Sequence, residues 1–200
     1  MAQESPDARG RMVAGAADMI RRRGLNATSV RELAKSSGAP LGSTYHYFPG
    51  GKYELATEAV RFAGDLTDAG LANALQTGGP HKGVKSFLAM WRKILIDGEF
   101  RAGCPVLAVT IEDLPVDQTA PLDAAAAAFL KWKATLAESL HEHGVSKVSA
   151  QRHAALIVAA VEGAVAMCRA QRSIEPFDQV SAELTDLVGD LLKSVRKPNA

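Results

Sequence analysis

The chain has 200 residues, 47% of them hydrophobic, and a formal net charge of +1. This composition supports a packed core and excludes a mainly disordered chain, and the near-neutral charge gives no general affinity for nucleic acid. The charge is uneven, because residues 1–55 hold eight basic and five acidic side chains, for +3, and the remainder holds fifteen and seventeen, for −2. A mildly basic head on a mildly acidic body fits either a DNA-binding module or chance scatter.

Alanine is abundant and no long segment alternates apolar and polar residues, so the sequence predicts an all-α fold. Cys104 and Cys168 lack the spacing of a zinc site or a C-x-x-C pair, and we expect free thiols in a reducing cytosol. No uninterrupted apolar run approaches membrane-spanning length, and no signal peptide precedes the first predicted helix. We therefore expect a soluble cytoplasmic protein that binds no membrane.

The first predicted helix spans residues 7–23 and follows a polar tail over residues 1–6. Its apolar residues recur at helical spacing and form one stripe: Met12, Val13, Ala16, Ala17 and Ile20. Gly24 followed by Leu25 is typical of a helix C-cap. The three arginines at 21–23 suit the negative end of the helix dipole, and contact with phosphate is the alternative interpretation.

Two short helices joined by a tight turn come next. Ser29 and Glu32 have the spacing of a capping box at the start of the first helix, and Gly38 is placed to end it. The second helix, over residues 41–48, is rich in hydroxyl and aromatic side chains. Such side chains suit a groove of phosphates and base edges better than a protein core. The pattern is typical of a DNA-binding helix-turn-helix.

More than a dozen positions share the residue types and spacing of one known family: Thr28-Ser29-Val30-Arg31-Glu32-Leu33-Ala34, Gly38, Gly42-Ser43-Thr44-Tyr45-His46-Tyr47-Phe48 and Lys52. Over about residues 9–55 the sequence resembles the DNA-binding domain of the TetR (tetracycline-repressor-like) family. Pro40-Leu41 departs from the Ser-Lys or Ser-Arg pair that is common in the family. The turn Pro49-Gly50-Gly51-Lys52 is one residue longer than usual and resembles a subgroup associated with control of drug-efflux genes.

The resemblance implies two sets of DNA contacts. The base contacts come from the start of the second short helix: Leu41, Gly42, Ser43 and Thr44. At Gly42 the missing side chain allows the backbone to approach the DNA closely. The phosphate contacts, which set register and salt dependence, come from Thr28, Tyr45, Tyr47 and Lys52. The alternatives are core packing for Tyr45 and a solvated helix start for Lys52, and the role of His46 is the least defined.

Further helices are predicted over about residues 52–76, 81–98, 121–143, 149–171 and 177–195, with a short buried helix over 103–112 that has Pro105 in its first turn. The first of them, ended by Thr77–Pro80, has an expected inner face of Leu55, Ala59, Phe62, Leu66 and Ala69, and would act as a lever on the recognition helix. The alanine run at 124–128 permits close approach of a neighbouring helix. We expect a helix-turn-helix domain over 1–55 and a ligand-binding and dimerisation domain over 56–200, with about nine helices.

The body is expected to hold an effector pocket. Its candidate residues are mainly apolar or aromatic, which predicts a small hydrophobic or aromatic ligand. They are Phe62, Leu66, Phe87, Trp91, Cys104, Leu107, Ile111, Phe129, Trp132, Glu162 and Met167. Core packing is the alternative for each. Glu162 differs from the others, because an acid among apolar neighbours requires a partner, either a cationic ligand or an arginine across a dimer.

The helices over 149–171 and 177–195 carry more apolar surface than one helical layer hides. The resemblance implies a homodimer in which these two helices form a four-helix bundle with their symmetry mates. The alternative is that both apolar stripes complete the core of the monomer.

Catalytic and metal-binding patterns are absent from the sequence. His141 and His143 point to different sides of a helix, and the acidic pair Glu112-Asp113 stands at a predicted helix end. We expect that the protein is not an enzyme and that it binds no cofactor. The sequence predicts a TetR-type repressor that leaves a pseudo-palindromic DNA operator when a ligand binds. The alternatives are a redox-sensing regulator acting through Cys104 and a ligand-binding helical module with weak DNA binding.

Overall fold

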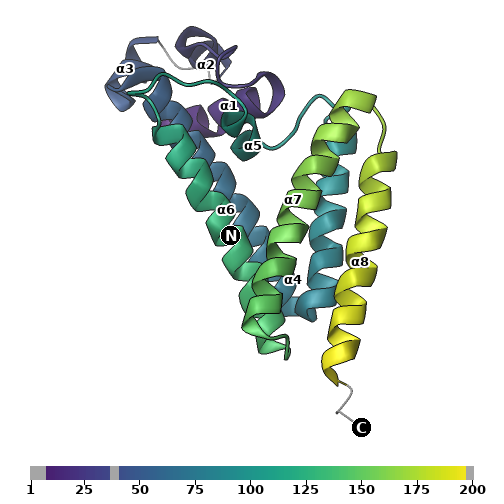
Figure 1. Ribbon diagram of the computed structural model, residues 1–200. Helices are drawn as coiled ribbons and strands as arrows, with labels where there is room; N and C mark the ends of the chain where they lie inside the picture. The colour runs from purple at the N-terminus through teal and green to yellow at the C-terminus, as the bar shows by residue number, and fades with distance from the viewer. Residues whose placement is uncertain (1–7, 37–40, 197–200) are drawn as a thin grey trace, which may run out of the picture. The chain divides into compact units, whose positions relative to one another are not determined.

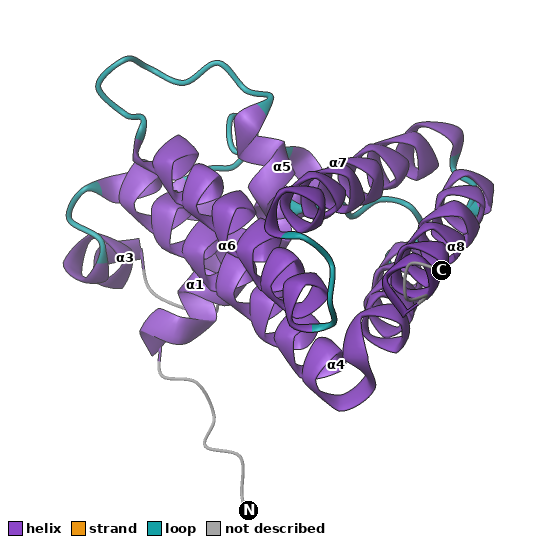
Figure 2. Ribbon diagram, turned by 60° about the horizontal axis from the view of Figure 1, so that its bottom comes forward, coloured by secondary structure: helices purple, strands orange, loops and turns teal. Residues whose placement is uncertain are grey.

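The computed structural model describes residues 8–36 and 41–196, without the side chains of Leu33, Ser36, Leu41, Ser43 and Arg196. The predicted polar tail and the predicted roles of Gly38 and Pro40 lie outside these residues. The described part is helical with connecting loops and contains no strand, which confirms the all-α prediction (Figure 2). Figure 1 labels its helices: α1 (Ala8–Arg23), α2 (Val30–Ser36), α3 (Leu41–Tyr47), α4 (Gly51–Asp97), α5 (Pro105–Thr110), α6 (Ala120–Glu142), α7 (Lys147–Gln171) and α8 (Glu175–Arg196).

The long helix α4 consists of two helices joined at a kink. Gly79 has φ 66° and ψ 178°, which a helix does not allow, and Pro80 follows it. A glycine adopts this conformation without steric cost, and the proline begins the second half where a backbone N–H is not required. The predicted break at 77–80 is therefore confirmed. Counted with the two halves of α4 apart, the described residues contain nine helical segments, as predicted.

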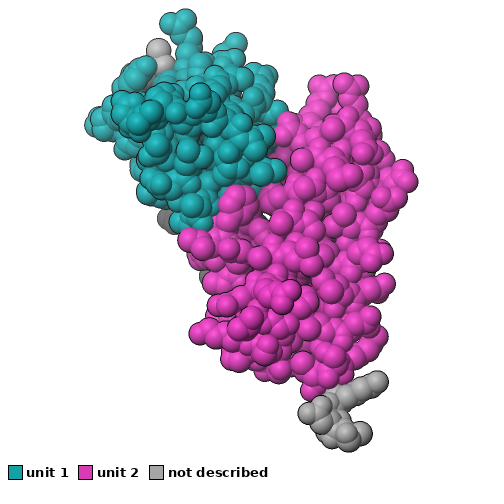
Figure 3. Space-filling view, in the orientation of Figure 1, with its two compact units in different colours: residues 1–65, 104–128 teal, residues 66–103, 129–200 magenta. Residues whose placement is uncertain are grey.

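The chain forms two compact units (Figure 3). Unit 1 comprises residues 1–65 and 104–128, and unit 2 comprises residues 66–103 and 129–200. The helix-turn-helix lies in unit 1 together with α5 and the beginning of α6. The predicted domain boundary at residue 55 falls inside α4 and stays a prediction.

The core of unit 1 is built on α1, whose buried residues are those of the predicted apolar stripe. This helix packs against α2 and α5, and α2 packs against α3. The Phe48 side chain, which follows α3, is completely buried. A Cβ atom built at Gly64 of α4 would lie 2.7 Å from the Cβ of Ala128, so the alanine run of α6 does permit the predicted close approach.

In unit 2, α7 and α8 lie side by side (Figure 1). By length and composition alone, α7 is apolar enough to cross a membrane, contrary to the expectation that no segment would qualify, and among the described helices it is alone in this. Nine of its side chains are buried within unit 2. The core helix of a soluble protein passes the same test of length and composition. We therefore interpret α7 as a core helix.

The predicted inner face of the first half of α4 is confirmed at Leu55 and Ala59, which are buried, and is wrong at its last three residues. Phe62 and Leu66 are 43% and 64% exposed, and Ala69 is exposed as well. The buried face instead carries Gly64 and Asp68, between apolar residues that precede and follow them. Asp68 is accommodated there because it accepts a hydrogen bond from the Thr135 hydroxyl at 2.7 Å and lies 3.5 Å from the ammonium group of Lys131.

Candidate nucleic-acid interface and effector cavity

The start of α2 has the predicted capping box. The Ser29 hydroxyl accepts a hydrogen bond from the Glu32 backbone N–H at 3.2 Å, and the Glu32 carboxylate accepts one from the Ser29 backbone N–H at 3.3 Å. Two backbone donors that the helix leaves without partners are satisfied in this way. The predicted C-cap of α1 is also present, since Gly24 has φ +81° and Leu25 is buried. Both ends of the turn between α1 and α2 are therefore fixed by local sequence.

Two of the predicted DNA contacts fall on buried threonines. Thr28 is buried, and its hydroxyl donates to the Gly24 carbonyl at 2.7 Å. Thr44 is also buried, and its hydroxyl oxygen has no hydrogen-bond partner. These side chains face the interior of unit 1, so their placement argues against the predicted phosphate and base contacts.

The remaining described side chains of α3 face outwards to different degrees. Tyr45 is 54% exposed, His46 is exposed and Tyr47 is half-buried. The rings of His46 and Tyr47 meet edge to face, with centroids 5.4 Å apart. Gly42 is exposed, and a Cβ built there meets no atom within 4 Å. The predicted base contacts of Leu41 and Ser43 involve side chains outside the described ones.

Lys52, at the start of α4, is half-buried and contacts the turn between α1 and α2. Its ammonium group donates to the Asn26 carbonyl at 3.2 Å. Burial lowers the pKa of Lys52, and the nearby charge of Glu112 opposes that effect without cancelling it. An ammonium group has three donors, so this contact leaves capacity for a phosphate.

The arginines that end α1 are engaged with nearby acids. Arg21 and Arg22 pair with Asp18 one turn earlier, and Arg23 lies 3.6 Å from the Glu32 carboxylate. Burial raises the pKa of Asp18, but the hydrogen bonds and charges of Arg22 and Arg21 outweigh burial and leave that pKa lowered. These pairs agree with the structural interpretation of the arginine trio.

The cation of Arg9 approaches a neighbouring aromatic ring. Its guanidinium carbon lies 5.0 Å from the centre of the Phe48 ring, and the same group pairs with Glu58. This arrangement ties α1 to the beginning of α4 beside the end of α3.

Four of the predicted effector residues meet in unit 2. Phe87, Trp91, Trp132 and Glu162 line one internal cavity, which also contacts Leu71, Val158 and Val161. The cavity volume is about 10 Å³, space for about one water molecule. Phe87 and Trp91 meet edge to face at 6.5 Å, and the indole nitrogen of Trp91 is buried without a hydrogen-bond partner. Sequence patterns did not identify the three aliphatic residues, because any buried helix face contains such side chains.

The other candidate effector residues do not line this cavity. Phe62, Leu66, Ile111 and Met167 are exposed, and the exposure of Ile111 contradicts the expectation that all of 103–112 is buried. Leu107 and Phe129 are half-buried, and Phe129 packs edge to face on Trp132. The predicted short helix α5 is otherwise confirmed, since Pro105 stands in its first turn and four of its six side chains are buried.

Both cysteines are buried. Cys104 caps the beginning of α5, where its sulfur accepts a hydrogen bond from the Leu107 N–H at 3.5 Å. Burial raises the pKa of Cys168, with a lowering from the backbone of Phe177 and a further raising from Asp178. A buried thiol with a raised pKa reacts slowly with oxidants. These placements do not favour a redox sensor.

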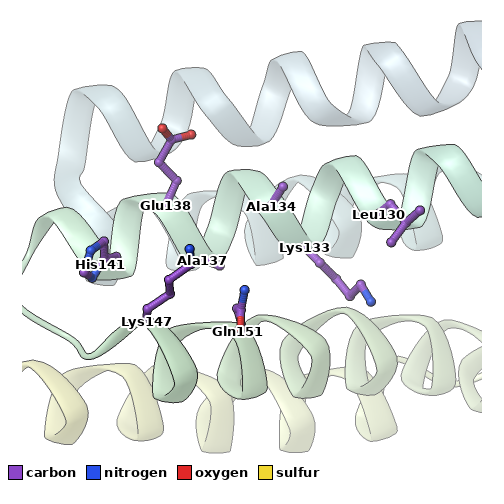
Figure 4. Close-up of a pocket in the computed structure, with 8 residues that line it drawn as sticks. All are labelled: Leu130, Lys133, Ala134, Ala137, Glu138, His141, Lys147 and Gln151. Carbon is purple, nitrogen blue, oxygen red and sulfur yellow. The ribbon is translucent and has the colours of Figure 1, made fainter.

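Larger hollows lie on the surface of unit 2. A groove of about 510 Å³ runs between α6 and α7, where Lys133, Lys147 and Gln151 face the gap and Glu138 points away (Figure 4). A groove of about 620 Å³ runs along α7 and α8, lined mainly by apolar side chains that include Leu156 and Leu187. No predicted effector residue lines either groove.

The histidines in this part of the chain are used structurally. Nδ1 of His141 is bonded to the Val145 carbonyl at 2.9 Å, and Nδ1 of His143 to the Ser139 carbonyl at 2.8 Å. Among the described residues no group of three or more potential ligands could hold a metal ion.

A capped helix α2 that packs on a short helix α3 with exposed aromatic side chains defines the chain as a helix-turn-helix DNA-binding protein. Residues 13–59 match the family described as "Bacterial regulatory proteins, tetR family". Residues 80–183, more than half of the chain, match "Transcriptional regulator LmrA/YxaF-like, C-terminal domain". The chain belongs to the TetR family of transcriptional regulators, and it is a regulator and not an enzyme.

Similar proteins cover nearly the whole chain. The HTH-type transcriptional regulator Rv0196 of Mycobacterium tuberculosis is 38% identical over 184 residues, which cover 90% of this chain and 93% of that protein. The HTH-type transcriptional regulator LmrA of Bacillus subtilis is 27% identical over 184 residues, covering 91% and 97%.

Solved structures have the same fold. A TetR transcriptional regulator from Legionella pneumophila superimposes with a TM-score of 0.82 at 19% identity, covering 92% of this chain and 99% of that one. The reduced form of E. coli NemR gives a TM-score of 0.73 at 23% identity, covering 90% and 96%. At such sequence identities, the structural similarity establishes the fold and gives no information about a ligand.

Proposed function

We propose that the protein is a homodimeric, cytoplasmic repressor that binds a pseudo-palindromic operator through α3 and is released by a small hydrophobic ligand. The observation that carries this proposal is the two-sided character of α3. Thr44 is buried in unit 1, whereas Gly42 and Tyr45 on the same short helix are exposed. In a dimer, two such helices enter successive major grooves about one helical turn apart.

The DNA contacts are assigned from exposure. Gly42 lies against base edges, and Tyr45, Tyr47 and Lys52 contact phosphates. Thr28 and Thr44 are left out of this assignment, because their side chains are buried.

Selection from a pool of random duplex DNA tests the proposal. A single palindromic motif is expected, and sequence-independent, salt-sensitive binding would contradict it. The Tyr45→Phe variant is expected to bind that motif about 3- to 10-fold more weakly, which corresponds to one hydrogen bond of about 1 kcal/mol. Tyr53→Phe, a half-buried tyrosine of α4 without an assigned contact, is the matched control.

The surface along α7 and α8 supports dimerisation through these helices. Its groove is mainly apolar, and Leu156 at its edge is 51% exposed in the single chain. Burying such a surface against its symmetry mate forms a four-helix bundle and removes apolar area from water. A second copy of this chain is the occupant that we assign to the groove.

The internal cavity of unit 2 supports the effector proposal. Its aromatic lining suits a hydrophobic or aromatic ligand, and the free indole N–H of Trp91 can donate to a polar atom of that ligand. The volume of about 10 Å³ means that the ligand must separate the aromatic side chains to enter. A ligand that favours this expanded form weakens operator binding by about 1–3 kcal/mol of coupling.

The two tryptophans are the only ones in the chain, and both line the cavity. Their fluorescence therefore reports on ligand entry. Two matched naphthalene probes, one neutral and one with an ammonium group, are expected to quench it. Glu162→Gln should weaken the cationic probe and leave the neutral one unchanged. Operator release by a probe that leaves the tryptophan signal unaltered would contradict this assignment of the site.

A further inference from the structure

A carboxylate from the end of α5 holds the turn that precedes the helix-turn-helix. One oxygen of Glu112 accepts a hydrogen bond from the Leu25 backbone N–H at 2.5 Å, and the other accepts one from the Asn26 N–H at 2.6 Å. Glu112 is half-buried, and Leu25 is buried. Two charge-assisted hydrogen bonds from adjacent amides to one carboxylate are short and about twice as strong as neutral ones.

These two amides follow closely after α1, which ends at Arg23. The carbonyl of Asn26 is held from another side, by the ammonium group of Lys52 at 3.2 Å. The backbone of Asn26 is thus held at its N–H by Glu112, which follows α5, and at its carbonyl by Lys52 of α4. Gly24 leaves room for the carboxylate, since a Cβ there would lie 2.3 Å from a Glu112 oxygen.

The turn held by Glu112 is the connection between α1 and α2. Thr28 and Ser29 complete this turn, and the capping box of Ser29 and Glu32 fixes the start of α2 to the end of the turn. The helix α2 packs in turn on α3. On the other side, α5 packs against α1 and enters unit 1 directly after Gly103, the last residue of one segment of unit 2.

We propose that Glu112 is a positioning residue that locks the turn between α1 and α2 to α5, and thereby sets the geometry in which α3 meets DNA. The inference rests on the proposed function and deepens it. A lock of this kind depends on acceptor atoms at both amides. Glutamine has the same size but offers one acceptor oxygen and one NH₂ group, so one of the two amides would face another donor.

The test compares Glu112→Gln with Asp113→Asn, in the full-length protein. Asp113 is the exposed neighbouring acid, and its substitution makes the same change in net charge. Operator affinity, measured on the motif selected from random DNA, is expected to fall at least tenfold in E112Q relative to D113N. Affinity for random duplex DNA is expected to be equal in the two variants, because it reports charge and not geometry.

Hydrogen exchange in the free protein gives a second readout. The amide hydrogens of Leu25 and Asn26 should exchange faster in E112Q than in the wild type. In D113N their exchange rates should equal those of the wild type. If E112Q does not fold, Glu112→Asp replaces it, since aspartate keeps both acceptor oxygens on a shorter side chain. An operator affinity between those of the wild type and a tenfold loss is expected for E112D.

The inference is overturned if E112Q and D113N bind the operator equally, or if exchange at the two amides is the same in both. It is also overturned if E112Q loses operator and random DNA binding in parallel, because that indicates general damage. Failure of the wild type to select any motif overturns the proposed function, and the inference with it. The two failures are therefore distinguishable.

Discussion

Gly42→Ala separates the stability of α3 from its fit to DNA. A Cβ added at Gly42 meets no atom within 4 Å in the protein, and Gly42 is the second residue of a seven-residue helix. No described atom of unit 1 opposes the methyl group, so the substitution acts on the helix propensity and on whatever approaches α3 from outside. Gly70→Ala is the matched control, because Gly70 also lies in a helix and its added Cβ would meet only the flexible Met90 side chain at 3.4 Å.

The two effects of Gly42→Ala have opposite signs. Replacing an exposed helical glycine by alanine stabilises by about 0.5–1 kcal/mol, which for a chain of this size raises the midpoint of thermal unfolding by about 1–4 °C. If the backbone at Gly42 lies against base edges, the methyl group collides with the DNA. We expect a loss of operator affinity of at least tenfold, or about 1.4 kcal/mol.

The assay is thermal unfolding together with titration of the selected operator. G42A should be more stable and bind DNA more weakly, whereas G70A should gain similar stability and bind normally. Normal operator affinity in G42A would refute the close approach at this position. Reduced stability would refute the open environment that the structure gives to Gly42.

The remaining predictions concern the dimer, one ion pair and the thiols. Leu156→Glu should weaken self-association at least about 100-fold in sedimentation equilibrium, since two leucines leave the interface at about 1.5 kcal/mol each, whereas Leu130→Glu, which is 62% exposed on α6, should leave association unchanged. Asp18→Asn should cost less than about 1 kcal/mol at pH 7 in chemical denaturation, because the pair is partly exposed. The lowered pKa of Asp18 means that its stabilisation is present above the unfolded-state pKa and lost as pH falls through the folded one, so the cost should shrink below about pH 4. Ellman's reagent should label the two cysteines only slowly in the native protein, and rapid labelling of Cys104 would restore the redox alternative.

The parts of the fold that local chemistry determines were predictable from sequence. The capping box of Ser29 and Glu32 and the C-cap at Gly24 involve residues a few positions apart, and both are present as expected. The break in α4 at Gly79 followed from a Gly-Gly-Pro signal. Helix starts and ends of this type depend on neighbouring residues, which the sequence displays directly.

What escaped prediction depends on partners far away in sequence. Asp68 is buried because Thr135 donates to it, and the apolar spacing of Phe62 and Leu66 therefore indicated the wrong face of α4. Glu112 lies 87 residues from the amide of Leu25, so its position at a predicted helix end gave no sign of this contact.

The candidate sites were predicted to different extents. The polar and aromatic character of α3 indicated its exposure, and Tyr45 is exposed as expected, but Thr44 lies on the side of the short helix that faces the core. For the effector cavity, periodicity identified buried residues without showing which of them meet. Only Phe87, Trp91, Trp132 and Glu162 among the candidates share one cavity.

The most direct test of the account is a spacing series on the selected operator. Two recognition helices in one dimer read half-sites about one helical turn apart, on the same face of the duplex. Inserting about 5 base pairs between the half-sites turns one of them by half a turn, and we predict that affinity then falls to the level of random DNA. Unchanged affinity across the series would contradict the claim that a dimer reads this DNA through paired α3 helices.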